Sequence, residues 1–338
     1  MAPDPYGLGR VLGEPGVLPQ RARRLDPSLP VREDELCIDV DRLNVDAASF
    51  KQLREEAGGD AERLGRRIAE IVRERGKLQN PVTGSGGMLL GRVREVGASH
   101  PARGRLAAGD RIATLVSLTL TPLELRAVRR VDLAADRVDV EGHALLFSTG
   151  LWAKLPEDLP EPLALAALDV CWAPALTARH VRPGDRVLVV GAGKSGALCC
   201  AQARRSGARD VVAADISAEA CRRLESLGYA RGVPVDATRA LEAREALVGG
   251  HEGFDLVVNV ASVPGTEMAS LLCVRDGGTV IFFSMATSFT QAALGAEGIG
   301  KDATLLVGNG YAFGHAELTL DLLRKEPPLR RLLEERFR

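Results

Sequence analysis

Residues 186–196 read Arg-Val-Leu-Val-Val-Gly-Ala-Gly-Lys-Ser-Gly, and this stretch decides the fold. Its first half, Arg186–Val190, is a short apolar run typical of a buried strand, and a helix is expected to follow at 195–206. In a strand–turn–helix unit, the pattern Gly-x-Gly-x-x-Gly allows a tight turn, close approach of a pyrophosphate and close packing of helix on strand. The sequence therefore predicts a dinucleotide site at Gly191, Gly193, Lys194, Ser195 and Gly196.

The sequence beyond this turn continues the same rhythm of strands and helices. A further helix is expected at 218–227, and apolar stretches typical of buried strands lie at 210–214, 254–260, 278–283 and 303–307. Strands that are apolar nearly throughout and alternate with helices indicate a parallel sheet covered on both faces. The predicted fold class is α/β, with a Rossmann doubly wound parallel sheet in the second half of the chain.

The carboxylate of Asp215 indicates which dinucleotide binds. It ends the strand after the glycine turn, about 20 residues beyond it, where an acid binds the ribose 2′-hydroxyl and repels a 2′-phosphate. NAD is therefore preferred, although Arg222 and Arg223 keep NADP as an alternative, and a helix cap is the structural alternative for Asp215. Further cofactor-binding positions are predicted where later strands end, at Asp236, Ala237, Asn259, Val260 and Ser284.

The composition sets outer limits on the function. A chain of 338 residues is long for one core, so two domains are expected. The net charge of −1 argues against nucleic acid as a partner, and no apolar run is long enough to span a membrane. The start of the chain lacks the apolar segment of a signal peptide. Six scattered cysteines are expected to be reduced thiols, so a cytoplasmic location is predicted.

The first half of the chain is expected to be irregular β structure. Alternating stretches at 35–41, 91–97 and 110–116 predict strands, and 61–75 predicts an amphipathic helix. We place one domain at 1–165, the dinucleotide domain at 166–315 and a helical tail at 316–338.

An irregular β domain ahead of a dinucleotide domain resembles the medium-chain dehydrogenase/reductase superfamily. The resemblance implies a GroES-like first domain and an active site between the two domains. Zinc-containing members have Gly-His-Glu where this chain has Gly86-Gly-Met88, and a zinc cysteine near Asn44. Cys171 lies near the third ligand position, but one cysteine does not make a zinc site. No metal is therefore expected.

Several longer segments carry a more specific resemblance. They are 16–20, 47–50, 55–60, 75–76, 79–88, 113–118, 163–170, 282–289, 293–298, 300–302 and 307–311. Within the superfamily they are similar to the family of L-erythro-3,5-diaminohexanoate dehydrogenases of lysine fermentation. This resemblance implies reversible, NAD- or NADP-dependent oxidative deamination of a small diamino acid substrate.

A diamino acid needs carboxylates for its ammonium groups, a cation for its carboxylate and a base at the reacting nitrogen. Asp46 lies two residues beyond Asn44, where zinc-containing relatives carry a proton-relay hydroxyl. Asp169 interrupts an apolar run in which an unpaired charge is costly. Lys301, in a glycine-rich link that starts at the carboxyl edge of the sheet, is predicted to hold the substrate carboxylate or polarise the carbonyl. A helix cap or a structural hydrogen bond is the alternative for both acids, and an exposed loop for Lys301.

The predicted substrate-binding residues rest on weaker patterns. Glu55 and Glu56 belong to an acidic group that either binds the distal ammonium or is simply solvated. The hydroxyls of Ser117 and Thr119 would share one face of an extended segment, which lines the site or faces water. Ser85 and Glu297 are further candidates.

Two other functions are compatible with the sequence. One is a zinc-free quinone or enone reductase, in which Asp46 and Asp169 would have no clear use. The other is a nucleotide-binding protein without catalysis, since a fold alone does not establish activity. Whatever the function, the apolar stretch 303–307 could pair with a second copy as an uncovered sheet edge, so we expect a homodimer or a larger homo-oligomer.

Overall fold

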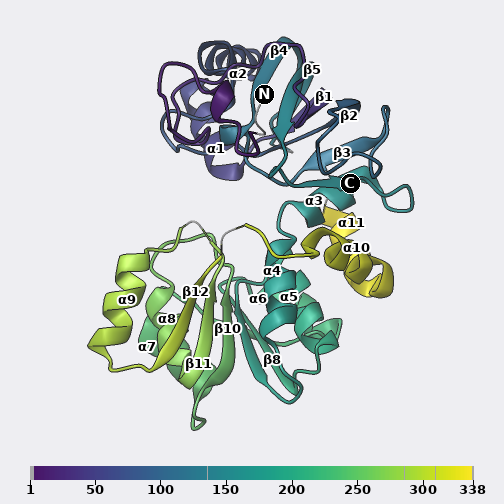
Figure 1. Cartoon of the computed structure of the whole chain (residues 1–338). Coiled ribbons are helices and arrows are strands. Elements are labelled where there is room, and N and C mark those ends of the chain that lie inside the picture. Colours follow the sequence, from purple (N-terminus) through teal and green to yellow (C-terminus); the bar gives the residue numbers. More distant parts are fainter. Residues whose placement is uncertain (1–3, 135, 285, 309, 337–338) are drawn as a thin grey trace. The chain divides into compact units, whose positions relative to one another are not determined.

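The computed structural model describes residues 4–134, 136–284, 286–308 and 310–336. The chain forms two compact units, Met1–Glu157 and Asp158–Arg338 (Figure 1). This division lies a few residues before the predicted boundary at 165, and the C-terminal helices belong to the second unit.

Over its described residues, the first unit is an antiparallel sheet with two α-helices and two short 3₁₀ helices, η1 and η2. The strands form one sheet in the order β4-β5-β1-β2-β3-β6, with β1 antiparallel to both β2 and β5. In chain order the elements are η1 (Leu8–Arg10), β1 (Glu35–Asn44), α1 (Ala47–Glu56), α2 (Ala61–Arg75), β2 (Met88–Val96), β3 (Arg111–Thr114), η2 (Leu118–Leu120), β4 (Leu123–Asp132), β5 (Arg137–Phe147) and β6 (Trp152–Lys154).

Helix α2 shows how the sequence pattern builds the core of this unit. The side chain of Asp60 caps its first turn, and Gly76 ends it with a left-handed φ of 61°. The apolar side chains between these caps recur with helical spacing, and the helix packs on β4. The buried residues of this face are Leu64, Ile68, Ile71 and Val72.

The register of the sheet brings three strand ends together. Asn44, the last residue of β1, lies opposite Met88 at the start of β2 and Arg137 at the start of β5. The loops before β2 and β5 and the start of α1 therefore meet at this end of β1, and this is where Asp46 lies.

The second unit is a parallel sheet with helices. In chain order its elements are α3 (Glu161–Leu168), α4 (Trp172–His180), β7 (Arg186–Val190), α5 (Lys194–Arg205), β8 (Asp210–Asp215), α6 (Ala218–Ser226), β9 (Arg231–Pro234), α7 (Ala240–Val248), β10 (Phe254–Asn259), α8 (Glu267–Cys273), β11 (Val274–Phe282), α9 (Phe289–Gly298), β12 (Ala303–Val307), α10 (His315–Lys325) and α11 (Pro327–Arg336).

The strand order, β12-β11-β10-β7-β8-β9, identifies the binding edge of this sheet. All pairs are parallel, and the order reverses between β7 and β10. Helix α5 packs on β7 and β8, and α8 packs on β10 and β11. Figure 1 shows these helices beside the sheet. In such sheets, ligands bind outside the carboxyl ends of the strands at the point of reversal.

The predicted α/β class, with a β domain ahead of a parallel-sheet domain, is confirmed. The predicted helix 61–75 and the strands 186–190 and 303–307 have the bounds that the sequence suggested. The extended interpretation of 117–121 is wrong, because this segment contains a 3₁₀ turn. Within the described ranges, we find no helix long and apolar enough to cross a membrane.

Candidate functional site

The carboxyl edge of the parallel sheet is one continuous row of backbone. One residue beyond the end of each strand, an amide N–H still bonds to the neighbouring strand, which places these residues about 4.8 Å apart. The bonds run from Gly191 to Ala214 (2.7 Å), from Val260 to Val190, from Phe283 to Asn259 and from Gly308 to Phe282 (2.9 Å each). This row is the surface on which an extended dinucleotide can lie.

The glycine turn fits a dinucleotide for steric reasons. A Cβ at Gly196 would lie 1.9 Å from the carbonyl oxygen of Gly191, so helix α5 approaches the turn too closely for any side chain. Gly191 has a φ of +105°, a backbone conformation that favours glycine. At Gly193, by contrast, an added Cβ would have only the Arg336 guanidinium nearby, at 4.0 Å. The space above Gly193 is therefore open to a phosphate at the helix N-terminus.

Asp215 lies beside this turn and contacts it directly. One carboxylate oxygen accepts the N–H of Ala192 at 2.7 Å, and the other accepts the N–H of Ser217 at 2.8 Å. The acid thus holds the turn and the start of the next helix in place. This position is compatible with the predicted contact to the ribose and with the alternative of a structural cap.

Charged side chains also flank the turn. Lys194, the first residue of α5, donates to Asp169 at 2.7 Å, and Asp169 follows α3 directly. The charge of Asp169 is therefore paired, as a charge next to an apolar run requires, and half exposed at the cofactor edge. The sequence analysis missed Arg336, because a residue near the chain end shows no local pattern that links it to a distant turn.

The remaining predicted cofactor residues differ in how far their side chains are buried and bonded within the fold. Asp236 accepts hydrogen bonds from the N–H and the hydroxyl of Thr238. Asp236 and Ala237 follow β9, and both are half-buried. Asn259 is fully buried and bonded to Thr266, Ser270 and Ala261, so its side chain is structural and not a cofactor ligand. Val260 and Ser284 lie buried at the carboxyl edge as predicted, and Ser195 is half-buried in the first turn of α5.

Lys301 and Glu297 lie at the wrong edge of the sheet for their predicted roles. The link that contains them starts at the carboxyl edge but returns through α9, so Lys301 lies two residues before β12 begins. Its ammonium donates to the carbonyl of Val274 at 3.1 Å and lies 3.7 Å from Asp276. A five-residue strand spans about 16 Å. Lys301 is therefore a structural residue of the amino edge, and Glu297 is an exposed residue at the end of α9.

In the first unit, Asp46 joins a group of hydroxyls that we call the hydroxyl cluster, Ser49, Thr83 and Ser85. Asp46 caps α1 by accepting the N–H of Ser49 at 3.0 Å, and its second oxygen accepts the hydroxyl of Ser85 at 2.8 Å. The hydroxyl of Ser49 lies 2.8 Å from that of Ser85 and 2.6 Å from that of Thr83. A chain of hydrogen bonds thus leads from the carboxylate to Thr83, which is exposed.

A second carboxylate, Asp136, lies close enough to interact with Asp46. Asp136 has a left-handed φ of 51°, and its carbonyl accepts the N–H of Val45 at 3.3 Å. Burial, opposed by Arg54 and reinforced by the charge of Asp46, raises the pKa of Asp136 above its usual range. The sequence analysis missed this residue, although an acid just before a strand that pairs with the end of β1 could have indicated it.

Ser117 and Thr119 pack beside this group in an unexpected way. The hydroxyl of Thr119 donates to that of Ser117 at 3.0 Å, and Thr119 is fully buried, so it neither faces water nor shares a strand face with Ser117. The N–H of Leu118 donates to the carbonyl of Gly87 at 2.9 Å. The turn thus supports the backbone next to Asp46, and of the two predicted hydroxyl residues Ser117 is partly exposed whereas Thr119 is not.

Glu55 and Glu56 lie at the opposite end of α1 from Asp46. A ten-residue helix is about 15 Å long, which exceeds the span of a small diamino acid. Glu55 lies 3.9 Å from Lys51, and Glu56 lies 2.9 Å from Arg67. Both are exposed and paired, which favours the alternative of a solvated acidic group over binding of the same small substrate as Asp46.

The residues at the positions of the zinc ligands do not fit zinc. Gly87, which takes the place of the histidine, has a φ of +106°, and a Cβ there would lie 2.1 Å from the carbonyl oxygen of Asn44. Among the described residues, no three His, Cys, Asp or Glu side chains are grouped so that they could hold a metal ion. Cys171 is buried, and burial raises the pKa of its thiol to about 12.

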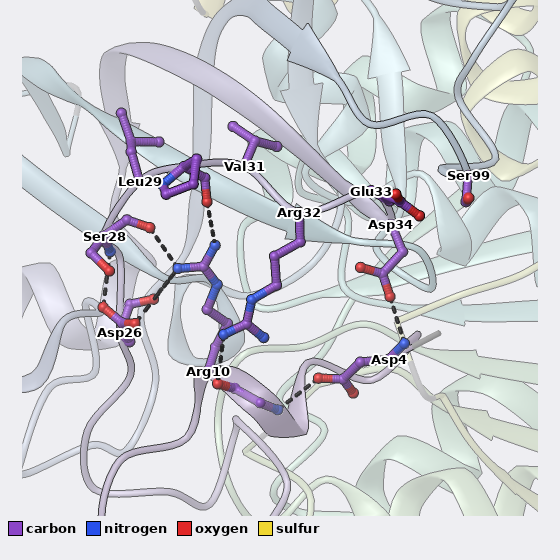
Figure 2. A pocket seen from close by; sticks show the side chains of 12 residues that line it. Asp4, Arg10, Asp26, Ser28, Leu29, Val31, Arg32, Glu33, Asp34 and Ser99 are labelled. Carbon is purple, nitrogen blue, oxygen red and sulfur yellow. Dashed lines mark hydrogen bonds and ion pairs between the residues drawn. The ribbon is translucent and has the colours of Figure 1, made fainter. Parts of the chain in front are cut away.

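A hollow of about 500 Å³ lies at the other end of β1 (Figure 2). Its central cation, Arg10, is buried and forms two hydrogen bonds with Glu35, at 2.7 and 2.6 Å, as well as bonds to backbone carbonyls. Glu35 begins β1, so the hollow lies about 30 Å from Asp46. Because this cation is neutralised within the fold, we assign the hollow to anchoring of the N-terminal segment.

Comparison with known sequences connects these features to a family. The model of the L-erythro-3,5-diaminohexanoate dehydrogenase N-terminal domain matches residues 9–156, and a model described as zinc-binding dehydrogenase matches residues 195–309. The L-erythro-3,5-diaminohexanoate dehydrogenase of Acetoanaerobium sticklandii is 48% identical over 98% of both chains. The enzyme of the same name from Fusobacterium nucleatum is 46% identical over 98% of this chain and 97% of its own.

Comparison with solved structures supports the fold. An alcohol dehydrogenase from Thermus sp. ATN1 superimposes with a TM-score of 0.53 at 20% identity, covering 91% of this chain and 89% of its own. An alcohol dehydrogenase from Thermotoga maritima gives 0.54 at 17% identity, covering 92% and 88%. At this identity the likeness concerns the architecture alone. The sequence matches over nearly the whole length carry the assignment, and the chain belongs to the L-erythro-3,5-diaminohexanoate dehydrogenase family.

Proposed function

We propose that this protein catalyses the reversible oxidative deamination of L-erythro-3,5-diaminohexanoate to 5-amino-3-oxohexanoate. One substrate with its C3 nitrogen as an ammonium, one water and one oxidised nicotinamide dinucleotide are consumed, and the ketone, ammonium, a proton and the reduced dinucleotide are formed. The near-full-length match to dehydrogenases of this name carries the proposal. The carboxylates Asp46 and Asp136 support it, since they suit a substrate with two ammonium groups and have no clear use with a quinone.

The second unit supplies the cofactor site in this proposal. The open backbone above Gly193 and the N-terminus of α5 receive the pyrophosphate, with the cations of Lys194 and Arg336 nearby. Asp215 lies where the adenine ribose is expected, and its charge favours NAD over NADP. When bound there, the dinucleotide would supply the acceptor for the hydride released from C3 of the substrate.

The first unit supplies proton transfer. The C3 ammonium must lose a proton before C3 can release a hydride, and Asp46 is the proposed acceptor of that proton. Ser85 donates to the same carboxylate, so the hydroxyl cluster can pass the proton on to exposed Thr83 and water. Water then adds to the substrate iminium and gives one proton to Asp46. Asp46 returns this proton to the amine nitrogen, which leaves as ammonia and takes up the remaining hydroxyl proton, so that the ketone and ammonium are formed. Asp136 provides a second negative charge for the ammonium groups.

An assay with Asp46→Asn tests this function and its base. The wild type should reduce NAD in the presence of 3,5-diaminohexanoate, followed by the absorbance of the reduced nicotinamide. Because Asn caps a helix as well as Asp does, the variant should fold, and kcat should fall about 10²- to 10⁴-fold with dinucleotide affinity unchanged.

The matched control is Glu55→Gln, which removes an exposed carboxylate from the far end of the same helix and should leave kcat unchanged. Undiminished turnover by Asp46→Asn would remove Asp46 from the mechanism. A wild type that turns over a quinone with NADPH and ignores the diamino acid would overturn the proposed function.

The same proposal includes a homodimer in the cytoplasm with a role in lysine fermentation. Strand β12 is at the edge of its sheet and Val307 is 54% exposed, which supports pairing with a second copy. All six cysteines are free and buried, which supports a reducing compartment. Sedimentation of the purified protein would test the dimer.

A further inference from the structure

A buried amide in the first unit contacts every member of the hydroxyl cluster and has no role in the mechanism above. The side-chain nitrogen of Asn80 donates to the carbonyl of Ser49 at 3.4 Å, and its side-chain oxygen accepts the N–H of Thr83 at 3.3 Å. The backbone N–H of Asn80 donates to the carbonyl of Ser85 at 2.8 Å. Asn80 is only 1% exposed, so it supports the hydroxyl cluster from inside the fold.

The two shortest side-chain bonds of Asn80 connect the segments that carry these hydroxyls. Its nitrogen donates to the side-chain oxygen of Gln52 in α1 at 2.8 Å, and its oxygen accepts the N–H of Val82 at 2.8 Å. Together with the bonds to Ser49 and Thr83, they use both donors and both acceptor positions of the amide. Neither an apolar side chain nor a carboxylate can replace this amide without leaving partners unbonded.

The segment that carries Thr83 depends on such bonds for its position. Residues 81–84 are all exposed, so burial of apolar side chains contributes little to holding them in place. Gly84 has a left-handed φ of 73°, and its N–H donates to the carbonyl of Asn80 at 2.8 Å, which closes the turn on Asn80 itself. The position of the Thr83 hydroxyl therefore follows from the position of Asn80.

The chain of hydrogen bonds from Asp46 to Thr83, which we call the proton route, is sensitive to this position. Ser85 donates to Asp46 at 2.8 Å, and the hydroxyls of Ser49 and Thr83 lie 2.6 Å apart. Each of these contacts joins α1 or its cap to the segment that follows Asn80. Two hydroxyls that move apart by roughly 1 Å no longer form a hydrogen bond. Because Asn80 bonds the two segments to each other, it also fixes the contacts between them.

We propose that Asn80 is a positioning residue of the deamination reaction, which holds residues 82–85 against α1 so that their hydroxyls connect Asp46 with water. The proposal rests on the proposed function, because the proton route serves proton removal from the C3 ammonium. Asn80 is buried, so it acts through the hydroxyl cluster and not by contact with the substrate.

Kinetics with Asn80→Ala test the effect on proton transfer. In dilute buffer, kcat should fall about 10- to 100-fold, because a misplacement of about 1 Å can have an effect of this size. The solvent isotope effect on kcat should increase, and a high concentration of a small external base, imidazole, should restore most of the rate. Dinucleotide affinity should stay unchanged. A loss of kcat that imidazole does not restore, without an increased isotope effect, would overturn the proposal.

Two further variants make this test specific. Asn80→Asp keeps an acceptor for the N–H groups of Val82 and Thr83 but loses the donors to α1, so its kcat should lie between those of wild type and Asn80→Ala. It also serves as the test variant if Asn80→Ala does not fold, as judged by its thermal unfolding. Gln79→Ala is the matched control, since this neighbouring amide donates to the carbonyl of Gly84 at 3.4 Å and should be nearly dispensable for kcat. Equal losses in Gln79→Ala and Asn80→Ala would contradict the proposed role of Asn80.

A double variant tests whether Asn80 acts through the proton route. Asn80→Ala combined with Ser85→Ala should be no slower than Ser85→Ala alone, because both changes interrupt the same chain of hydroxyls. Losses that multiply would mean that Asn80 acts independently of Ser85, against the proposal.

Amide hydrogen exchange tests the positioning apart from any activity. In folded Asn80→Ala, exchange at residues 82–85 should become faster while β1 and β2 keep their protection. Unchanged exchange at residues 82–85, or faster exchange throughout the first unit, would rule out a specific positioning role. A wild type that does not oxidise the diamino acid would contradict the proposed function, whereas the exchange still decides whether Asn80 positions the hydroxyl cluster.

Discussion

The dipeptide Gly-Lys occurs at both edges of the same parallel sheet, and its two copies do different things. Gly193-Lys194 opens helix α5 at the carboxyl edge, where the glycine is open to a ligand and the lysine pairs with Asp169. Gly300-Lys301 precedes β12 at the amino edge, where the lysine is bonded to the carbonyl of Val274. The direction of the strand, and not the local residues, decides which copy can meet a cofactor.

The largest difference in dinucleotide affinity between variants at the two edges is expected when a glycine at each edge is replaced by alanine. In Gly196→Ala the new Cβ would lie 1.9 Å from a backbone oxygen, so the turn must move, which costs about 1–3 kcal/mol. Dinucleotide affinity should fall roughly tenfold or more, since each 1.4 kcal/mol corresponds to a factor of ten. Titration calorimetry with NAD measures the loss.

Gly300→Ala is the matched control at the amino edge. A Cβ at Gly300 meets nothing within 4 Å, although φ is +61°. It should cost about 1–2 kcal/mol of unfolding free energy and leave NAD affinity unchanged. If Gly300→Ala lost affinity as well, the functional contrast between the edges would be wrong.

The two lysines allow a smaller test of the same contrast. Lys194→Met should weaken NAD binding by about tenfold, because it removes a cation from the pyrophosphate site. Lys301→Met should leave kcat/KM for the diamino acid unchanged and lower the unfolding free energy by about 1 kcal/mol, the value of one hydrogen bond. Reduced turnover with Lys301→Met would restore Lys301 as a functional candidate.

A third copy, Gly76-Lys77, extends the comparison to the first unit and predicts a pH effect. Lys77 is fully buried and donates to the carbonyls of Pro19 and Gln20, at 2.8 and 3.1 Å. Burial, aided by Arg75, lowers its pKa from 10.5 to about 8. Below pH 8 the lysine is charged in both the folded and the unfolded chain. Between pH 8 and 10.5 the folded chain releases its proton first, so the contribution of Lys77 to stability rises with pH there.

Denaturant unfolding of wild type and Lys77→Met at several pH values would measure this effect. The buried cysteines act in the opposite direction above pH 9, because burial raises their thiol pKa values to about 11 for Cys37 and about 12 for Cys199. They are present in both proteins, so the difference between wild type and variant isolates the lysine. A difference that stays constant between pH 7 and 10 would contradict the lowered pKa.

The sequence predicted the second unit better than the first for a physical reason. A parallel sheet is built from local strand–turn–helix units, so the glycine turn, its strand and its helix could be recognised within one short window. Lys301 was assigned to the wrong edge of the sheet. The link that contains it starts at the carboxyl edge and ends at the amino edge, and a residue close to the next strand lies at the amino edge. Arg336 reaches the edge only through the packing of a helix that is distant in sequence, which no local pattern indicates.

The substrate half depends on pairings that are remote in sequence. Asp46 was proposed from its position relative to the zinc ligands of relatives, and its bond to Ser85 links two of the predicted residues. Asp136 reaches the same place because β5 pairs with the end of β1. The hydroxyls of Ser117 and Thr119 followed an alternating pattern that a 3₁₀ turn also allows, so the pattern could not distinguish the two conformations.

The backbone at Gly87 constrains how this chain can change. A histidine placed there would meet the carbonyl oxygen of Asn44 at 2.1 Å and would also need a φ of +106°, which L side chains rarely adopt. No single mutation can therefore convert this site into a metal site, and intermediates on that path would first lose the support of the strand end that holds Asp46. An engineer who wants alcohol oxidation from this scaffold should rebuild the loop before β2 as a whole rather than exchange individual residues.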